Sequence, residues 1–169
     1  MKRFLIFICA FVFSASQVPA QDNWTAVETS TLVGQLTTTI SEGYIFRTKS
    51  GNYYMANNQK SQRIKLNSPQ VSVLTDGKVY KLVIAGLDKP VLANKMEEVV
   101  ESTLDGEFRG WSGKTTFTLI NGQIWQQDTF STLTANSVNR PTVFIYKTKD
   151  GYKLQVEDVE ETLLVRRLR

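Results

Sequence analysis

The chain has 169 residues, a formal net charge of +4, 41% hydrophobic residues, one cysteine and no histidine. The absence of histidine excludes catalysts that pair a Ser or Cys nucleophile with His, and with a single cysteine it excludes ordinary zinc sites. This length fits one ordinary domain or two small ones.

The first twenty residues have the pattern of an export signal. Lys2 and Arg3 precede an apolar run from Phe4 to Phe13, and small residues follow as far as Ala20. A run of about ten apolar residues is too short to cross a bilayer, but it is typical of a secretory signal peptide. We predict a Sec signal peptide at residues 1–20, cleaved after Ala20, and a periplasmic or secreted protein.

Cleavage would remove Cys9, so the exported protein has no disulfide, which favours a bacterial envelope or medium. It would also remove Lys2 and Arg3, which lowers the formal charge from +4 to +2. A charge this close to neutral argues against a nucleic-acid partner. No second apolar segment is long enough to cross a membrane, so we predict no stable span.

The rest of the chain contains an internal repeat. Ser30–Gly34, STLVG, returns as Ser102–Gly106, STLDG, and Asn67–Pro69 returns as Asn139–Pro141 at the same offset of 72 residues. Such a repeat predicts two copies of one structural unit. The predicted organisation is a lead-in at 21–29, a first repeat at 30–96, a linker at 97–101 and a second repeat at 102–169.

A hairpin is predicted at the centre of the second repeat, where Asn121-Gly122 lies between two strand-like runs. A two-residue type I′ turn at this pair would place Thr118 opposite Trp125. Opposed residues share a face of the sheet, so Trp125 should lie on the polar face, away from the core face that carries Phe117.

Strand patterns dominate both repeats, and the only helix-like stretch is Lys95–Glu101, KMEEVVE. We therefore predict an all-β protein of two tandem five-stranded SH3-like small barrels. An OB-fold is the alternative, although it usually carries a helix between its third and fourth strands, for which each repeat has no room.

The second repeat also resembles a known group of sequences. Its segments are GEF-x-GW-x-G at 106–113, NGQ-x-WQQ at 121–127 and RP at 140–141. With these segments it is similar to uncharacterised exported bacterial proteins with small SH3-like β-barrel repeats. The resemblance covers residues 102–168, and it implies a fold but no activity, because that group has no established function.

Repeats of this size, about 67 residues, bury too little surface to be very stable alone. Without disulfides, each repeat needs a partner, so we predict that the two barrels pack on each other. The outward-facing candidates for this contact in the second repeat are Trp125, Phe144, Tyr146 and Leu164.

Aromatic, amide and guanidinium groups in the second repeat form a candidate ligand site for a peptide or a glycan. The predicted ligand-binding residues are Arg109, Trp111, Trp125, Gln126, Gln127 and Tyr146. Two alternatives stay open: Trp111 could be a core residue at a strand end, and Trp125 could be covered by the other repeat.

The sequence predicts a non-catalytic exported binding or scaffolding module that recognises a cell-envelope peptide or glycan, mainly through the second barrel. The alternative is a structural or assembly partner of another envelope protein, bound through an exposed strand edge. A hydrolase that uses carboxylates alone, such as those of Glu157–Glu161, is disfavoured because adjacent carboxylates usually form a solvated loop. No cofactor, metal or catalytic residue is predicted.

Overall fold

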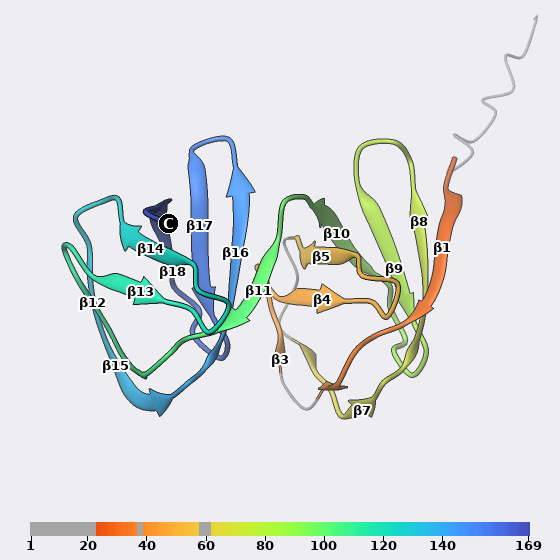
Figure 1. Cartoon of the computed structure of the whole chain (residues 1–169). Coiled ribbons are helices and arrows are strands. Elements are labelled where there is room, and N and C mark those ends of the chain that lie inside the picture. Colours follow the sequence, from red (N-terminus) through yellow and green to blue (C-terminus); the bar gives the residue numbers. More distant parts are fainter. Residues whose placement is uncertain (1–22, 37–38, 58–61) are drawn as a thin grey trace, which may run out of the picture.

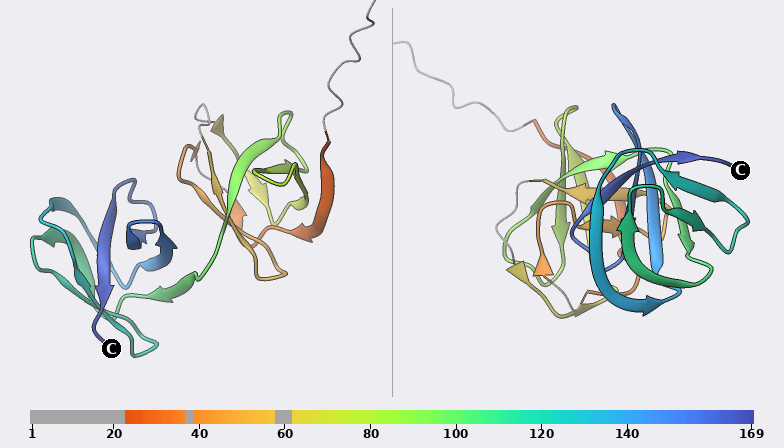
Figure 2. Two further views of the ribbon diagram at one scale, coloured as in Figure 1. Left: turned by 90° about the horizontal axis from the view of Figure 1, so that it is seen from above. Right: turned by 90° about the vertical axis from the view of Figure 1, so that its left-hand side faces the viewer.

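The computed structural model describes residues 23–36, 39–57 and 62–169. Every regular element among these residues is a β-strand, which confirms the all-β prediction. The strands form two units that lie side by side, joined by one short connection between β10 and β11 (Figure 1 and Figure 2). The predicted signal peptide lies outside the described residues.

The strands follow one another along the chain in two similar series. The first unit consists of β1 (Thr25–Thr31), β2 (Gln35–Leu36), β3 (Thr39–Ile40), β4 (Ile45–Arg47), β5 (Tyr53–Ala56), β6 (Gln62–Arg63), β7 (Leu66–Asn67), β8 (Gln70–Thr75), β9 (Tyr80–Ile84) and β10 (Val91–Met96). The second unit consists of β11 (Val100–Thr103), β12 (Glu107–Ser112), β13 (Thr116–Thr118), β14 (Ile124–Gln127), β15 (Thr132–Asn139), β16 (Thr142–Thr148), β17 (Gly151–Val156) and β18 (Thr162–Arg167).

The two units have the same topology. The main sheet of each has six strands, in the order β1-β8-β9-β10-β5-β4 and the matching order β11-β16-β17-β18-β14-β13. A bridge between Leu32 and Thr48 joins the ends of the first sheet, and one between Leu104 and Leu119 joins those of the second. The sequence repeat therefore corresponds to a structural repeat.

Each unit has more strands than the five predicted, and the additional strands lie in segments that were expected to be loops, lead-in or linker. β1 occupies most of the predicted lead-in, and β11 begins inside the predicted linker. The helix-like stretch 95–101 is instead the end of β10 and the start of β11. Its helix propensity is overridden because Val100 and Glu101 pair with Ile145 and Phe144 of β16.

The predicted register of the β13–β14 hairpin is wrong by one residue. Phe117 lies opposite Trp125, and the Leu119 amide donates to the Gln123 carbonyl over 2.9 Å. The connecting loop therefore has three residues, of which only Gly122 has positive φ, +83°, where a type I′ turn needs two.

A one-residue slip turns every side chain of a strand to the other face of the sheet. Trp125 consequently lies in the core with Phe117 and is only 2% exposed. The first unit has the same register, because Tyr54 lies opposite Phe46 and is 1% exposed. The prediction that Trp125 lies on a polar face is therefore wrong.

Each unit has its own hydrophobic core. Equivalent aromatic pairs lie in the two units: Tyr54 and Tyr80 have ring centroids 5.5 Å apart, and Trp125 and Tyr152 have centroids 5.2 Å apart. The cores hold mainly aliphatic side chains from the central strands, and neither core is shared between the units.

Candidate functional site

Side chains of β4 and β5 in the first unit meet those of β11 and β16 in the second. Glu101 accepts hydrogen bonds from the Arg47 guanidinium, with which it also forms an ion pair, and from the Tyr53 hydroxyl at 2.8 Å. The Tyr53 and Phe144 rings pack in a T-shaped arrangement, with centroids 6.4 Å apart. We call Arg47, Tyr53, Glu101 and Phe144 the interface clamp.

The clamp joins charged and aromatic groups rather than aliphatic ones. Burial, and then the hydrogen bond to the carboxylate of Glu101, raise the pKa of Tyr53, which keeps its hydroxyl protonated as a donor at neutral pH. Nearby, the Gln155 amide approaches the Gly43 carbonyl at 3.5 Å. These contacts place the two units against each other, as an interface between two separate cores.

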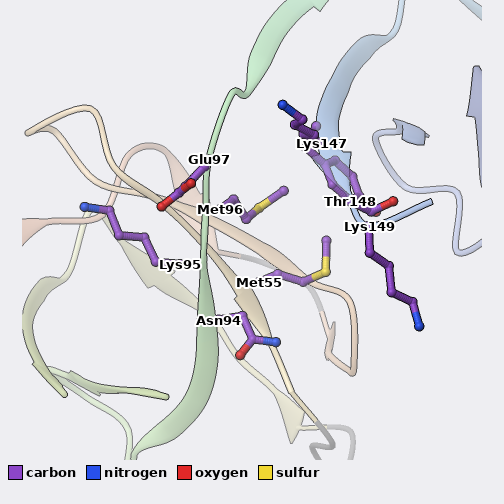
Figure 3. Close-up of a pocket in the computed structure, with 9 residues that line it drawn as sticks. Met55, Asn94, Lys95, Met96, Glu97, Lys147, Thr148 and Lys149 are labelled. Atoms are coloured by element: carbon purple, nitrogen blue, oxygen red, sulfur yellow. The ribbon is translucent and has the colours of Figure 1, made fainter. Parts of the chain in front are cut away.

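A cleft of about 400 Å³ opens beside the clamp, between the units. Its walls come from β5, β10 and the following residues in the first unit, and from the end of β16 and its turn in the second. Figure 3 shows the thioethers of Met55 and Met96 between the strand that carries Asn94 and the turn at Lys147–Lys149. The lining residues are Met55, Asn94, Lys95, Met96, Glu97, Tyr146, Lys147, Thr148 and Lys149.

The cleft combines apolar and cationic groups. Met55, Met96 and Tyr146 supply thioether and aromatic surface, while three lysines supply positive charge. Tyr146 is only 6% exposed, and burial raises its pKa to about 12. Its phenol therefore stays neutral, and the charge of the cleft comes from its lysines and Glu97.

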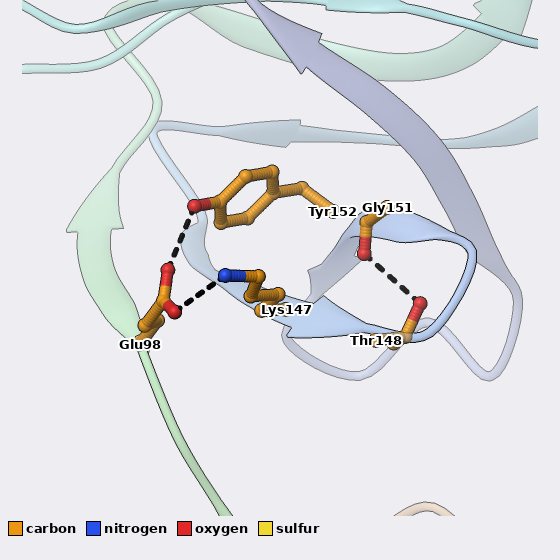
Figure 4. A network of polar contacts seen from close by, with 5 residues as sticks. All are labelled: Glu98, Lys147, Thr148, Gly151 and Tyr152. Carbon is orange, nitrogen blue, oxygen red and sulfur yellow. Dashed lines mark hydrogen bonds and ion pairs between the residues drawn. The ribbon is translucent and has the colours of Figure 1, made fainter.

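One of the three lysines is already paired. Lys147 donates to the Glu98 carboxylate over 2.7 Å, and the Tyr152 hydroxyl donates to the other oxygen of Glu98 over 2.9 Å (Figure 4). The hydrogen bonds from Lys147 and then Tyr152 lower the pKa of Glu98. Among the described residues, Lys95 and Lys149 have no acidic partner within ion-pair distance.

The six predicted site residues do not form one surface. Trp111, Trp125 and Gln127 are buried, at 5%, 2% and 4% exposure. Tyr146 lines the cleft. Gln126 and Arg109 lie elsewhere at the surface, where Gln126 accepts a hydrogen bond from Arg166 and Arg109 pairs with Glu107 at 2.8 Å.

Gln127 has a positioning role inside the second unit. Its amide nitrogen donates to the carbonyls of Thr129 and Ser131 over 2.9 and 2.7 Å, and its amide oxygen accepts from the Thr115 amide over 3.3 Å. The Trp111 indole donates to the Ser131 hydroxyl over 3.1 Å. Two residues predicted to bind a ligand thus hold the loop between β14 and β15.

The lining of the cleft could not be predicted from the sequence. Met55 and Met96 belong to one repeat and Lys147 and Lys149 to the other, so their proximity depends on how the units sit together. Phe130, by contrast, stands out in the sequence itself. It is the only aromatic residue of the polar stretch 128–140, and the structure leaves it 90% exposed.

Within the described part of the chain, no group of three or more His, Cys, Asp or Glu side chains is placed to hold a metal ion. No helix in that part has the length and apolar character needed to cross a membrane. No protein-family model, curated protein or solved structure matches the chain.

Proposed function

We propose that the protein is a non-catalytic binding or scaffolding module of the bacterial cell envelope. Residues 1–20 direct its export, and the mature chain recognises an envelope peptide or glycan at a site to which both units contribute. The observation that carries this proposal is the cleft of about 400 Å³ beside Tyr146, at the boundary of the two units.

The chemistry of the cleft favours a peptide with carboxylate groups. Thioether side chains adapt to ligand surfaces of different shape, which suits Met55 and Met96 to apolar contacts. The ammonium groups of Lys95 and Lys149 are free to meet carboxylates, because neither has an acidic partner among the described residues. A cleft between two small domains is a common place for a ligand.

We also propose that each unit is SH3-like, and this proposal offers an analogy for the ligand. Bacterial SH3 modules bind cell-wall peptides or glycans, which would make peptidoglycan one concrete target. Because a fold does not determine a function, the analogy guides only the choice of the first ligand.

The test is a pull-down of the mature chain with purified peptidoglycan sacculi. The wild type should sediment with the sacculi, and the double variant Lys95→Glu/Lys149→Glu should lose most of this binding because its cleft repels carboxylates. Lys78→Glu/Lys89→Glu, which makes the same charge change in the exposed turns between β8 and β9 and between β9 and β10, should bind like the wild type. Equal binding by the Lys95→Glu/Lys149→Glu variant and the wild type would contradict a role for the cleft.

A second candidate function rests on the edge of β15. This strand of eight residues, TLTANSVN, has no charged residue and no proline, and β12 is its only strand partner among the described residues. Natural proteins usually protect such an edge, because its free backbone groups can pair with another chain. The protein would then be an assembly partner that takes up a strand of another envelope protein.

The two candidate functions differ in which variant should lose binding. Thr134→Lys/Asn136→Lys charges two exposed positions of β15 and should block strand addition without affecting binding to sacculi. Thr162→Lys, an exposed position of the central strand β18, is the control. If the β15 variant abolishes recovery of a partner from envelope extracts and the cleft variant does not, the assembly function is favoured.

A further inference from the structure

Phe130 is the most exposed of the large hydrophobic residues in the described chain. Its exposure is 90%, while the other exposed ones lie between 41% and 58%. It belongs to the loop between β14 and β15, at the end of the second unit that is farthest from the first unit (Figure 1). A single exposed apolar side chain is ordinary at a protein surface, so a role for Phe130 must be argued from the way its loop holds the ring.

The loop that carries Phe130 is fixed on both sides of the ring. Gln127, only 4% exposed, donates to the carbonyls of Thr129 and Ser131, the two neighbours of Phe130. The Ser131 carbonyl also accepts the Gly113 amide over 3.0 Å. A buried amide with all its groups satisfied rigidifies its surroundings, so the ring is presented by an ordered backbone.

One edge of the Phe130 ring rests on the turn between β12 and β13. Its Cε2 and Cδ2 atoms lie 3.2 and 3.4 Å from the point where a Cβ atom at position 113 would be. Gly113 has φ of +82°, which glycine adopts without strain. One edge of the ring therefore lies close to Gly113, while most of its surface stays open.

The surroundings of the ring do not favour a bilayer or a large protein partner. The residues that flank Phe130 and Gly113 in the two loops are polar: Ser112, Lys114, Asp128, Thr129 and Ser131. Stable attachment to a membrane needs more than one weak anchor. A specific protein interface buries about 800 Å² on each partner around a cluster of anchors, whereas Phe130 stands alone.

We propose that Phe130 is a stacking platform for a sugar ring of an envelope glycan. The face of an aromatic ring carries negative charge density, which attracts the slightly positive C–H groups on the flat side of a sugar. The rim of a sugar carries hydroxyls, which can hydrogen-bond to the polar residues that flank Phe130 and Gly113 in the two loops. This inference rests on the proposed role in envelope binding and adds a ligand class and a second site.

The platform belongs to the second repeat alone. The residue equivalent to Gln127 at the end of β5 is Ala56, which has no amide to hold a loop. The residue aligned with Trp111 is Thr39, which has no indole to bond such a loop. The first unit therefore lacks two of the groups that fix Phe130, which agrees with a site specific to one copy.

The probe is a soluble β-1,4-linked N-acetylglucosamine tetramer, titrated into the ¹⁵N-labelled mature chain and followed by NMR. We expect shifts of the amides of Gly113 and residues 128–131, saturating in the millimolar range. Phe130→Ala should weaken binding about tenfold or more, which corresponds to about 1.4 kcal/mol. Phe130→Trp should restore binding, and Ile120→Ala, which removes another exposed apolar side chain of the second unit, should leave the tetramer affinity unchanged.

Three outcomes would overturn the inference. The first is an absence of shifts in this loop at about 10 mM tetramer, and the second is equal affinity of Phe130→Ala and the wild type. The third is cosedimentation with anionic lipid vesicles that requires Phe130. If the protein binds sacculi but the amides of the loop do not shift with the tetramer, the platform is refuted and the proposed function stands. If the loop amides shift but the protein does not bind sacculi, only the envelope role is refuted.

Discussion

The Tyr53 hydroxyl of the first unit donates to the Glu101 carboxylate of the second over 2.8 Å, and the same carboxylate pairs with Arg47. Glu101 lies in β11, the strand that begins the second unit immediately after the connection from β10. The side chain is 20% exposed, so the pair is only partly screened by water. One acidic residue thus links the two units at the point where the chain passes between them.

Glu101→Ala should lower the free energy of unfolding by about 1 to 2 kcal/mol, because it removes two charge-assisted hydrogen bonds in a half-buried place. Urea denaturation followed by circular dichroism measures this. Asp105→Ala is the matched control, since the Asp105–Arg140 pair lies within one unit and both side chains are more than half exposed. The control should lose no more than about 0.5 kcal/mol, and equal losses would refute the clamp.

A second prediction concerns acid stability and Glu28 in β1. Burial would raise the pKa of Glu28, but hydrogen bonds from Ser50, Tyr54 and Asn52, together with Thr48, lower it below its ordinary value of 4.5. Its charged form is therefore preferred in the folded state, so its contribution is fully present above about pH 4.5 and is lost as the pH falls through the lowered value.

Glu28→Gln should accordingly be less stable than the wild type at pH 7, by about 1 kcal/mol. The difference between the two proteins should shrink as the pH falls below about 4.5. Thermal unfolding from pH 7 to pH 2.5 measures both curves. A difference that stays constant over this range would show that Glu28 is not held ionised by its hydrogen bonds.

A third prediction concerns Gly110, at the bulge between β12 and β15. A Cβ atom there would lie 1.9 Å from the Leu133 carbonyl oxygen, and φ is +109°. Gly110→Ala should lower the free energy of unfolding by more than about 3 kcal/mol, because the backbone of β15 must move to make room for the methyl group. Gly106→Ala, at φ of +137° with nothing within 4 Å, should cost only about 1 to 2 kcal/mol of backbone strain.

A fourth prediction separates the two kinds of aromatic residue in the second unit. Trp125→Ala removes a side chain that is 2% exposed, so it should cost about 3 to 5 kcal/mol. Phe130→Ala removes one that is 90% exposed and should change stability by less than about 0.5 kcal/mol. Thermal unfolding of both variants measures these losses. A Trp125→Ala protein as stable as the wild type would show that Trp125 is not a core residue.

The sequence was sufficient to predict the all-β class and the twofold repeat, because both rest on local patterns. The turn of the β13–β14 hairpin was located correctly, yet its length was not. Asn-Gly favours a two-residue turn, but a three-residue loop with glycine in the left-handed position satisfies the same pair. The choice between them depends on burying Trp125, which is a property of the whole unit.

The candidate site was harder to predict, since aromatic residues serve both cores and surfaces. An indole and an amide are typical ligand-binding groups, but here the Trp111 indole donates to the Ser131 hydroxyl and the Gln127 amide donates to backbone carbonyls of the same loop. The cleft depends on Met55 and Lys149, which are 94 positions apart and become neighbours only through the packing of the two units. No local pattern carries that information.

The most direct test of the two-unit arrangement is native-state hydrogen exchange of the mature chain across a urea titration. Amides of β8 and β9 report on the first core, and those of β16 and β17 report on the second. If the units stabilise each other through Glu101, both sets should open with free energies within about 1 kcal/mol of each other, and Glu101→Ala should lower both. Well-separated opening free energies that do not respond to Glu101→Ala would show two independent domains and contradict the account.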